Sequence, residues 1–490
     1  MSLILLFLIL LSISLSWATS FSYPTPQTFI QCMSKQFGPY TKFVGTIYTS
    51  NSSLYLHLLQ SSQQNPRWLN FSTPKPLLII TPFQESEIQA IILCSKKYNL
   101  QIRVRSGGHD YKGLSYLCKT PFILVDLFNL RSVEINLEDE TAWVQTGATL
   151  GELYYSLAKR SEIHGFPAGL CPSVGVGGHL SGGSLCTLLW KYGLAADNVL
   201  DAYLIDANGK ITDRETMGED LFWAIRGRGG ASFGVILSWK IKLVRVPPTV
   251  TTFNIKKTLE QGATKLVSKW QYISDKLHED LFIRVIIQNV GNGTQKTVQA
   301  SFNSLFLGGV DRLMPLMNES FPELGLQAEN CTEMNWIQSI LFFEWISNKF
   351  LKEERVFMIM DPSGGQMKEI SESDIPFPHR KGNLYNIQYL VWWEVNGIKA
   401  SNKHVHWIRM LYKYMRPYVS KFPRAAYLNY RDLDFGTNKE SNVSYLEARV
   451  WGLKYFKGNF KRFAQVKSKV DPKNFFRNKQ SIPFLETGAD

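Results

Sequence analysis

Short apolar runs bounded by turn residues recur along the first half of the chain. The run at residues 77–80 lies between prolines and predicts a buried strand. Residues 85–98 follow with helical periodicity, and residues 102–105 predict a second strand. The series is completed by strands at 122–125 and 142–145, a helix at 150–159, and a hairpin at 199–212 around Asn208 and Gly209. This alternation predicts an α+β domain that ends near the two prolines at 247 and 248.

The second half of the chain has a different pattern, in which strands alternate with aromatic-rich helices. Residues 282–287 and 384–391 predict strands, residues 401–415 predict an amphipathic helix, and residues 367–381 predict a loop. A chain of 490 residues is too long for one ordinary core. We therefore expect two domains, at 21–248 and 249–421, followed by a C-terminal segment at 422–490.

The N-terminus is typical of a secretory signal peptide. Residues 3–17 are almost purely apolar and small residues follow them, although a basic first region is missing. The run is short for a membrane span, which leaves an uncleaved anchor as the alternative. We expect a leader at 1–20 and entry into the secretory pathway. In that pathway some Asn-x-Ser/Thr sequons carry glycans, and the sequons lie at Asn51, Asn70, Asn292, Asn318, Asn330 and Asn442.

The formal charge of +13 comes from Lys and Arg residues that are scattered along the chain. A positive charge of this size could attract nucleic acid or a polyanionic polymer. No Lys/Arg run or recognition motif accompanies it, so the sequence favours a solvated basic surface and no nucleic-acid partner. No segment after the leader reaches spanning length without charges, and we expect no membrane span there.

Two glycine-rich turns carry the most specific chemistry. The string RSGGHDY at 105–111 contains His109, and GLCPSVGVGGH at 169–179 contains Cys171. Glycines let backbone N–H groups approach a ligand, and successive N–H groups form anion-binding concavities. One nucleophile in each turn suggests a phosphate-bearing cofactor that is bonded at two points. Neither turn has the G-x-G-x-x-G spacing between a strand and a helix, so a Rossmann domain is not supported.

These turns resemble those of the plant berberine bridge enzyme-like FAD-linked oxidases, of the vanillyl-alcohol oxidase flavoprotein superfamily. The resemblance extends from about residue 29 to residue 483 and includes KYGLAADN at 191–198, DLFWAI at 220–225, GGASFG at 229–234, YLNYRD at 427–432 and VDPKNFF at 470–476. It implies an α+β fold with a two-part FAD-binding domain, whose core is at about 72–248. It also implies an antiparallel-sheet substrate domain with helices, and a C-terminal segment that returns to the FAD domain.

The resemblance further implies bicovalent FAD, with His109 bonded to the flavin 8α-methyl group and Cys171 bonded to ring carbon 6. The other cofactor-binding positions that it implies are Arg105, Ser106, Gly107, Gly108, Asp110, Val174, Gly175, Gly177, Gly178, His179 and Gly182. A small valine at position 174 is associated in the family with oxygen access to the flavin, whereas leucine blocks it. No CxxC or Cys/His cluster suggests a metal.

The remaining cysteines divide into one implied pair and three unassigned residues. The resemblance pairs Cys32 with Cys94 and so ties the N-terminal arm to the first helix. Cys118, Cys186 and Cys331 remain unassigned. Because Cys331 lies inside the sequon of Asn330, we expect it to be exposed if that asparagine is glycosylated.

The catalytic positions depart from those of relatives that oxidise alcohols. In such relatives a tyrosine that faces the flavin acts as the base, and a lysine favours its phenolate form. The matching positions here are Leu185 and Asn386, so both members of that pair are missing. The surviving candidates for a phenol base or a substrate clamp are Tyr427 and Tyr430, with Tyr111 and Asn429 beside them.

Two further positions bear on the substrate. Gln388 stands where the alkaloid-cyclising relative has its catalytic glutamate, and an uncharged amide cannot act as that base. Arg284 lies on a predicted strand, from which it either projects toward the substrate and favours an anion or points elsewhere as a packing residue.

These observations together predict a monomeric oxidase located extracellularly, in the cell wall, or in the vacuole. We expect it to oxidise a specialised metabolite, either an alkaloid or a phenolic or terpenoid compound, and to reduce O2 to H2O2. The expected partners are therefore a small-molecule substrate and O2. The alternatives are a flavin-bearing cyclase or cycloaddition enzyme without net redox, a monolignol or carbohydrate oxidase, and a non-catalytic wall protein.

Overall fold

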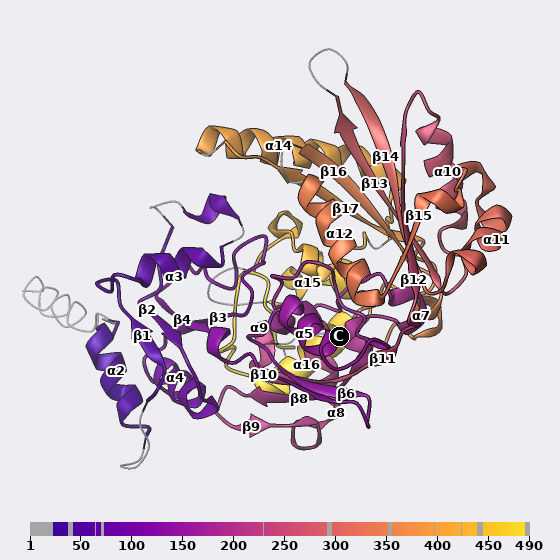
Figure 1. Ribbon diagram of the computed structural model, residues 1–490. Helices are drawn as coiled ribbons and strands as arrows, with labels where there is room; N and C mark the ends of the chain where they lie inside the picture. Colours follow the sequence, from indigo (N-terminus) through magenta and orange to yellow (C-terminus); the bar gives the residue numbers. More distant parts are fainter. Residues whose placement is uncertain are drawn as a thin grey trace, which may run out of the picture.

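The fold is known from a computed structural model, which contains three larger sheets, a two-stranded sheet and their covering helices in the described residues (Figure 1). It describes residues 23–37, 43–63, 65–69, 73–228, 230–291, 296–350, 355–395, 397–422, 424–438 and 444–485. The predicted leader and the sequons at Asn70, Asn292 and Asn442 lie outside these residues. The architecture is α+β, as the sequence predicts.

The first sheet has the strand order β1-β2-β4-β3, in which β2, β4 and β3 are parallel and β1 is antiparallel to β2. Every residue of β2 and β4 is buried, because apolar residues occupy both faces of a sheet that is covered on both sides. The elements are β1 (Thr46–Tyr48), β2 (Leu78–Thr81), β3 (Gln101–Arg105), β4 (Phe122–Asp126), α2 (Pro26–Ser34), α3 (Tyr55–Ser61) and α4 (Glu85–Lys97).

The second sheet is antiparallel and has the order β5-β6-β10-β8-β9. The predicted hairpin is confirmed by β8 and β9, with Gly209 at φ +78° in the turn. The strands are β5 (Val133–Asn136), β6 (Thr141–Gln145), β8 (Val199–Ile205), β9 (Ile211–Thr212) and β10 (Val235–Lys242), while β7 (His164–Gly165) pairs separately with β11 (Val244–Arg245). The helices of this region are α5 (Leu150–Ala158), α6 (Val176–Ser181), α7 (Leu189–Tyr192), α8 (Arg214–Arg228) and α9 (Gly230–Phe233).

The third sheet is the largest, with the order β15-β12-β14-β13-β16-β17, and all its pairs are antiparallel. Its strands are β12 (Val250–Thr258), β13 (Leu281–Val290), β14 (Thr297–Phe306), β15 (Cys331–Met334), β16 (Arg355–Pro362) and β17 (Tyr385–Trp392). The accompanying helices are α10 (Ala263–Ile273), α11 (Val310–Ser320), α12 (Trp336–Phe350), α13 (Gln366–Glu369) and α14 (Ile398–Met415). The predicted loop at 367–381 thus overlaps a short helix, and α14 begins three residues before its predicted start.

The C-terminal segment packs against the elements of the first half of the chain. Helices α15 (Tyr445–Phe456) and α16 (Asn459–Val470) lie together, and α16 contacts α8 and α9. The ammonium of Lys467 is fully buried, where it donates to the Ser232 carbonyl at 2.6 Å and pairs with Asp471 at 2.7 Å. A buried ammonium requires such partners, and the bond to Ser232 joins two segments that are distant in sequence.

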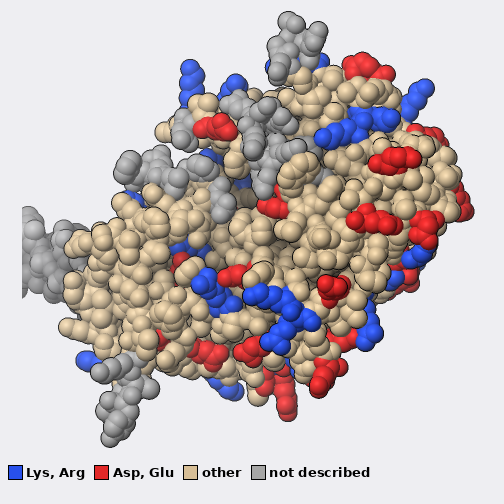
Figure 2. Space-filling view, viewed as in Figure 1, with Lys and Arg blue, Asp and Glu red and all other residues tan. Residues whose placement is uncertain are grey.

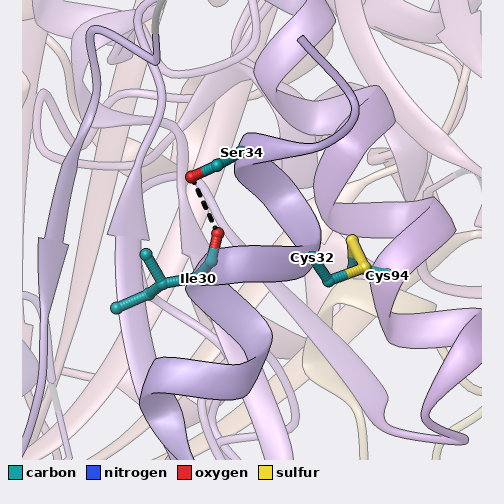
Figure 3. The surroundings of a disulfide bond; sticks show 4 residues. All are labelled: Ile30, Cys32, Ser34 and Cys94. Carbon is teal, nitrogen blue, oxygen red and sulfur yellow. Dashed lines mark hydrogen bonds between the residues drawn. A yellow bond between two sulfur atoms is a disulfide. The ribbon is translucent and has the colours of Figure 1, made fainter.

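Cysteine residues tie the N-terminal helix to the first sheet and its covering helix. Cys32 of α2 and Cys94 of α4 form a disulfide, as the resemblance implies (Figure 3). Cys118, Cys171, Cys186 and Cys331 form no disulfide. Cys331 is half-buried against the core, whereas exposure is expected for a residue inside a glycosylated sequon. Its place at the start of β15, paired with Phe253, accounts for the burial.

Charged side chains are mixed over the surface. Lys and Arg alternate with Asp and Glu on the face seen in Figure 2. Within the described ranges, no helix combines the length and the apolar character needed to cross a bilayer.

Candidate active site

The turn that carries His109 is anchored by the last residue of β3. The guanidinium of Arg105 is fully buried and pairs with Asp126 at 2.6 Å, and it also donates to the carbonyls of Leu58 and Leu59 at 2.6 and 2.9 Å. Four of the five N–H groups of Arg105 are engaged in this way, so Arg105 fixes the base of the turn. Asp110 closes the other end, because its carboxylate accepts the N–H of Lys112 at 2.8 Å.

The two glycine turns touch each other through their backbones. A Cβ added at Gly107 would lie 2.3 Å from the nitrogen of Gly175, and one added at Gly175 would lie 2.0 Å from the Ser106 hydroxyl. Neither position therefore accepts a larger residue. Ser106 donates in turn to the Thr146 carbonyl at 2.5 Å, which ties the contact to the second sheet. The contact explains why glycines occupy both turns and why the turns come together.

His109 and Cys171 converge on one hydroxyl group. The Nε2 atom of His109 lies 3.0 Å from the Oγ atom of Ser173, and the Sγ atom of Cys171 lies 3.5 Å from the same oxygen. Burial lowers the pKa of His109, so its imidazole is neutral and nucleophilic near neutral pH. Cys171 is exposed. Two nucleophiles from different turns thus reach the same small volume.

His179 closes the Cys171 turn. Its Nε2 atom accepts the backbone N–H of Gly169 at 2.8 Å, and Tyr154 donates to the Gly169 carbonyl at 2.7 Å. Burial, aided by the nearby His109, lowers the pKa of His179 to about 4, which keeps Nε2 available as an acceptor. His179 thus shapes the turn through its side chain.

Tyr427 ties the segment after the Cys171 turn to the C-terminal segment. Its hydroxyl oxygen accepts the N–H groups of Ser184 and Leu185 at 3.0 and 3.2 Å, and the amide of Asn429 at 2.9 Å. Ser184 has φ +74°, a conformation that non-glycine residues rarely adopt, and this conformation aims its N–H at the phenol. Gly182 leaves room for Asn429, because an added Cβ would lie 1.8 Å from the side-chain oxygen Oδ1 of Asn429 and would displace that side chain.

A second group of side chains brings Tyr111, Tyr430 and Gln388 together. The Tyr111 and Tyr430 rings stack with centroids 6.2 Å apart, and Gln388 donates to the Tyr111 hydroxyl at 2.7 Å. Burial raises the pKa of Tyr111 to about 12, so its phenol is neutral near neutral pH. Tyr430 lies on the 3-10 helix η7 (Leu428–Tyr430), and its ring meets Tyr427 edge to face at 4.9 Å.

Arg284 is neutralised by a carboxylate that the sequence analysis missed. Its guanidinium pairs with Asp361 of β16 at 2.5 Å, and both side chains are largely buried. Burial opposes the charge of Arg284, but Asp361 reverses that effect and raises its pKa. Arg284 therefore presents no free positive charge, and the pair favours hydrogen-bonding groups over an anion.

The ion pair lies within a polar row that crosses the third sheet. Strand register and the ion pair place five residues side by side on β12, β14, β13, β16 and β17, namely Asn254, Asn303, Arg284, Asp361 and Asn386. Both amide atoms of Asn303 and the Nδ2 atom of Asn386 are buried without a partner among the described residues. Because residues two apart on a strand share a face, Asn386 and Gln388 point to the same side.

The residues of the two glycine turns fit a flavin dinucleotide. Among the described residues, no acceptor is found for the backbone N–H groups of Gly107, Gly108 and Asp110. A Cβ added at Gly178 would meet nothing within 4 Å, so that glycine borders open space. Unpaired N–H donors beside a neutral histidine and an exposed thiol match the phosphates and the ring of such a cofactor. No group of three or more His, Cys, Asp or Glu within the described ranges could hold a metal ion.

Three residues of this site were missed by the sequence analysis: Ser173, Ser184 and Asp361. Ser173 lies inside the Cys171 string, and its position two residues after the cysteine was the available signal. Asp361 ends an apolar strand, where a lone carboxylate requires a partner.

Val174 is half-buried, and its carbonyl accepts the N–H of Leu150 at 2.9 Å, which fixes the backbone at this position.

Comparisons with known proteins agree with this geometry. Residues 76–214 match a family model described as "FAD binding domain", and residues 426–483 match one described as "Berberine and berberine like". Berberine bridge enzyme-like 22 of Arabidopsis thaliana is 52% identical over 98% of this chain and 99% of its own length. Tetrahydroberberine oxidase of Berberis wilsoniae is 49% identical, with 93% of each chain covered.

Solved structures give the same result. The structure of BBE-like #28 from Arabidopsis thaliana superposes with a TM-score of 0.86 and 43% identity, covering 94% of this chain and 100% of its own. Wild-type Phl p 4.0202, a glucose dehydrogenase, gives a TM-score of 0.85 at 43% identity, with 94% and 99% covered. A Phl p 4 variant with an isoleucine-to-valine exchange, described as a glucose oxidase, matches equally well.

Proposed function

The chain belongs to the berberine bridge enzyme-like family of FAD-dependent oxidoreductases, and we propose that it is a secreted oxidase of a specialised metabolite with bicovalent FAD. The observation that carries this proposal is the convergence of His109 and Cys171 on the Ser173 hydroxyl. When bound, FAD supplies the chemistry that accepts a hydride from the substrate and passes electrons to O2. Attachment at two points restricts its position and keeps it aligned with the substrate.

Val174 supports the choice of O2 as electron acceptor. The side chain is small and half-buried beside the Cys171 turn. In Phl p 4, the wild type is a glucose dehydrogenase and the isoleucine-to-valine variant is a glucose oxidase, so bulk at one position accompanies the difference. We infer that Val174 leaves a path by which O2 reaches the reduced cofactor.

Proton transfer in this enzyme is assigned to Tyr430. Tyr427 has its lone pairs engaged by three donors, so it cannot also accept a proton from a substrate. The Tyr430 hydroxyl has no partner among the described residues, and its ring lies beside Tyr111. Burial raises the pKa of Tyr430, so its phenol stays protonated near neutral pH and accepts a proton poorly. A substrate with its own usable lone pair, such as a tertiary amine, therefore suits the site better than a simple alcohol.

A carbohydrate is the second candidate substrate, and the polar row favours it. Arg284, Asp361, Asn303 and Asn386 offer donors and acceptors on one face of the sheet, as a polyhydroxylated ligand requires. Wild-type Phl p 4.0202 is a glucose dehydrogenase of the same fold. The row would bind hydroxyl groups, whereas the aromatic group of Tyr111 and Tyr430 would bind a flat ring.

One experiment separates these possibilities. The purified holoenzyme is mixed without oxygen with amine alkaloids, phenolic alcohols and oligosaccharides, and bleaching of the flavin absorbance is followed. Air is then admitted and H2O2 is measured. Bleaching by alkaloids with H2O2 on aeration supports the first proposal, and bleaching by oligosaccharides alone supports the second. Product formation without bleaching would instead indicate a cyclase without net redox.

Attachment of the cofactor is tested separately. Acid precipitation of the wild type should leave the yellow colour in the pellet, and the double variant His109→Ala Cys171→Ser should release it. The single variants should each keep one bond, because the two residues come from independent turns. Flavin that washes entirely from the wild type would contradict the bicovalent proposal.

Location in the secretory pathway rests on the predicted leader and on exposed sequons. Asn51, Asn318 and Asn330 are exposed in the structure, so each is accessible to glycosylation. Expression of the full chain in plant cells should give a protein that shifts in mass on deglycosylation and is recovered from the wall or the vacuole. An unglycosylated cytosolic protein would contradict this part of the proposal.

A further inference from the structure

Helix α14 presents an unusual surface, in which aromatic and basic side chains face outward. Residues 395–431 contain eight Lys and Arg residues and no Asp or Glu. No residue of α14 is buried. Its exposed large side chains include Trp407, Met410 and Tyr414, at 42, 51 and 68% exposure, and Tyr418 follows at 70%. We call Lys403, Trp407, Met410, Lys413, Tyr414 and Tyr418 the α14 face.

The exposed positions form one continuous stripe. Trp407, Met410 and Tyr414 recur every three to four residues, which places them about 5 Å apart along the axis of a helix. Tyr414 and Tyr418 also contact each other, with ring centroids 6.0 Å apart. A patch of this kind is rare on a surface without a partner.

The charges on the α14 face are also unpaired. Lys403 and Lys413 are exposed, and no ion pair is found for either among the described residues. Arg409, by contrast, pairs with Asp434 at 2.6 Å and is excluded from the face. Blue side chains project at the upper left of Figure 2, where α14 lies in Figure 1. The face therefore combines flat apolar rings with free positive charge.

The aliphatic residues in the middle of α14 point the other way. Val405, Ile408 and Leu411 are half-buried, and Tyr412 packs against Phe435 at 5.8 Å. A helix that binds a bilayer needs a broad aliphatic face for insertion, and the only strongly exposed aliphatic residue of α14 is Ile398 at its start. The exposed rings and lysines of the α14 face suit a ligand with flat C–H faces and repeated negative charges.

We propose that the α14 face binds an acidic polysaccharide, a polymer of uronic acid residues. The C–H faces of its sugar rings would stack on Trp407 and Tyr414, while its carboxylates would lie near Lys403 and Lys413. The net charge of +13 favours the approach of such a polyanion. Binding here would hold the enzyme on a polyanionic matrix and leave the active site free.

The test is affinity electrophoresis and calorimetry of the holoenzyme with polygalacturonate. The wild type should bind polygalacturonate, bind fully methyl-esterified polymer much more weakly, and release both as ionic strength rises. The variant Trp407→Ala Tyr414→Ala should weaken binding by at least about tenfold, because aromatic anchors dominate such interfaces. The variant Lys403→Gln Lys413→Gln should weaken binding and reduce its salt dependence.

A matched control comes from α10, which also exposes an aromatic residue and lysine. Tyr272 is 72% exposed and Lys265 is exposed nearby, so Tyr272→Ala Lys265→Gln should leave binding unchanged. Flavin content and turnover of a small substrate should be the same in all variants, which separates this proposal from the proposed function. Equal binding by the wild type and both α14 variants would overturn the proposal. So would binding to vesicles of anionic phospholipid with none to polygalacturonate.

Discussion

The rings of Tyr427 and Tyr430 meet edge to face with their centroids 4.9 Å apart, yet their hydroxyl groups lie in opposite environments. The oxygen of Tyr427 accepts three hydrogen bonds, whereas that of Tyr430 has no partner within the described ranges. Two phenols of one motif therefore have separate roles. One holds the backbone of the site, and the other is free to meet a substrate.

This difference gives a paired prediction. Tyr430→Phe should lower the turnover of alcohol substrates by about 10²–10⁴-fold, the usual contribution of a positioned proton-transfer group, with little change in stability. Its effect on tertiary amines should be much smaller, because they have no O–H proton to transfer. Tyr427→Phe leaves the N–H groups of Ser184 and Leu185 unpaired, and should lower the free energy of unfolding by about 1–3 kcal/mol. Urea denaturation and steady-state kinetics on both variants check this. A large kcat loss in Tyr427→Phe at unchanged stability would reverse the two assignments.

His179 should make stability depend on pH. Its pKa is lowered to about 4 by burial, against about 6.5 in an unfolded chain, so the unfolded state takes up the proton first. The neutral form contributes its full stability above about pH 6.5, and this contribution is lost as pH falls toward 4. Melting temperatures measured across this window should fall more steeply for the wild type than for His179→Gln, which keeps an acceptor but does not titrate. If the melting temperatures of the two proteins fell equally with pH, His179 would not be the group that makes stability depend on pH.

Val174 provides a steric test of oxygen access. Val174→Leu adds one methylene, and a methylene in a tight passage is worth about 1–3 kcal/mol. Reoxidation of the reduced enzyme by O2 should therefore slow by about tenfold or more, while reduction by substrate changes little. Stopped-flow absorbance follows both half-reactions. Val176→Leu, at a fully buried position of the same turn, serves as a control for general disruption of packing.

The disulfide between Cys32 and Cys94 should contribute strongly to stability. It closes a loop with a sequence separation of 62 residues, for which chain entropy gives about 4 kcal/mol. Cys32→Ser Cys94→Ser should show this loss in urea denaturation. Cys118→Ser removes a half-buried thiol that forms no disulfide, and should cost much less.

Local patterns were sufficient to predict some parts of this structure. The glycine turns were recognised from local sequence, and Gly107, Gly108 and Gly175 each meet a backbone atom that excludes a Cβ. The hairpin at Gly209, the strand before the His109 turn and the helix before the Cys171 turn were also predicted from short patterns, whereas the two-residue strand β7 was not. The function of His179 was harder to predict, since the string shows a histidine but not the N–H that it accepts.

The remaining features depend on pairing between distant segments. Tyr427 contacts Ser184 across 243 positions, and Arg284 contacts Asp361 across 77. Sheet register alone decides which residue stands opposite Arg284, and a shift by one residue would turn Asp361 to the other face. The sequence therefore left open whether Arg284 favours an anion or points elsewhere, and the neutralising carboxylate became visible only in the assembled sheet.

The last prediction concerns Leu185 and Asn386, which stand where relatives that oxidise alcohols have a tyrosine base and a lysine. Leu185→Tyr restores a phenol beside Tyr427, since the Leu185 N–H already contacts that hydroxyl at 3.2 Å. An unassisted phenol stays protonated near neutral pH, so this single change should raise the turnover of monolignol-type allylic alcohols only slightly. Adding Asn386→Lys supplies a positive charge that favours phenolate, and the double variant should exceed the single one.

The structure also sets a limit on that gain. Asn386 stands directly across from Asp361 in the paired strands, so the new ammonium would be shared between Asp361 and the phenolate. We therefore expect a gain of roughly tenfold, below the full 10²–10⁴-fold of a dedicated base. Stopped-flow reduction by coniferyl-type alcohols, measured against pH, checks this, because the double variant should gain a rising limb as its phenol ionises. A wild type that already oxidises these alcohols rapidly would show that Tyr430 suffices, and the case for a divergent substrate would fail.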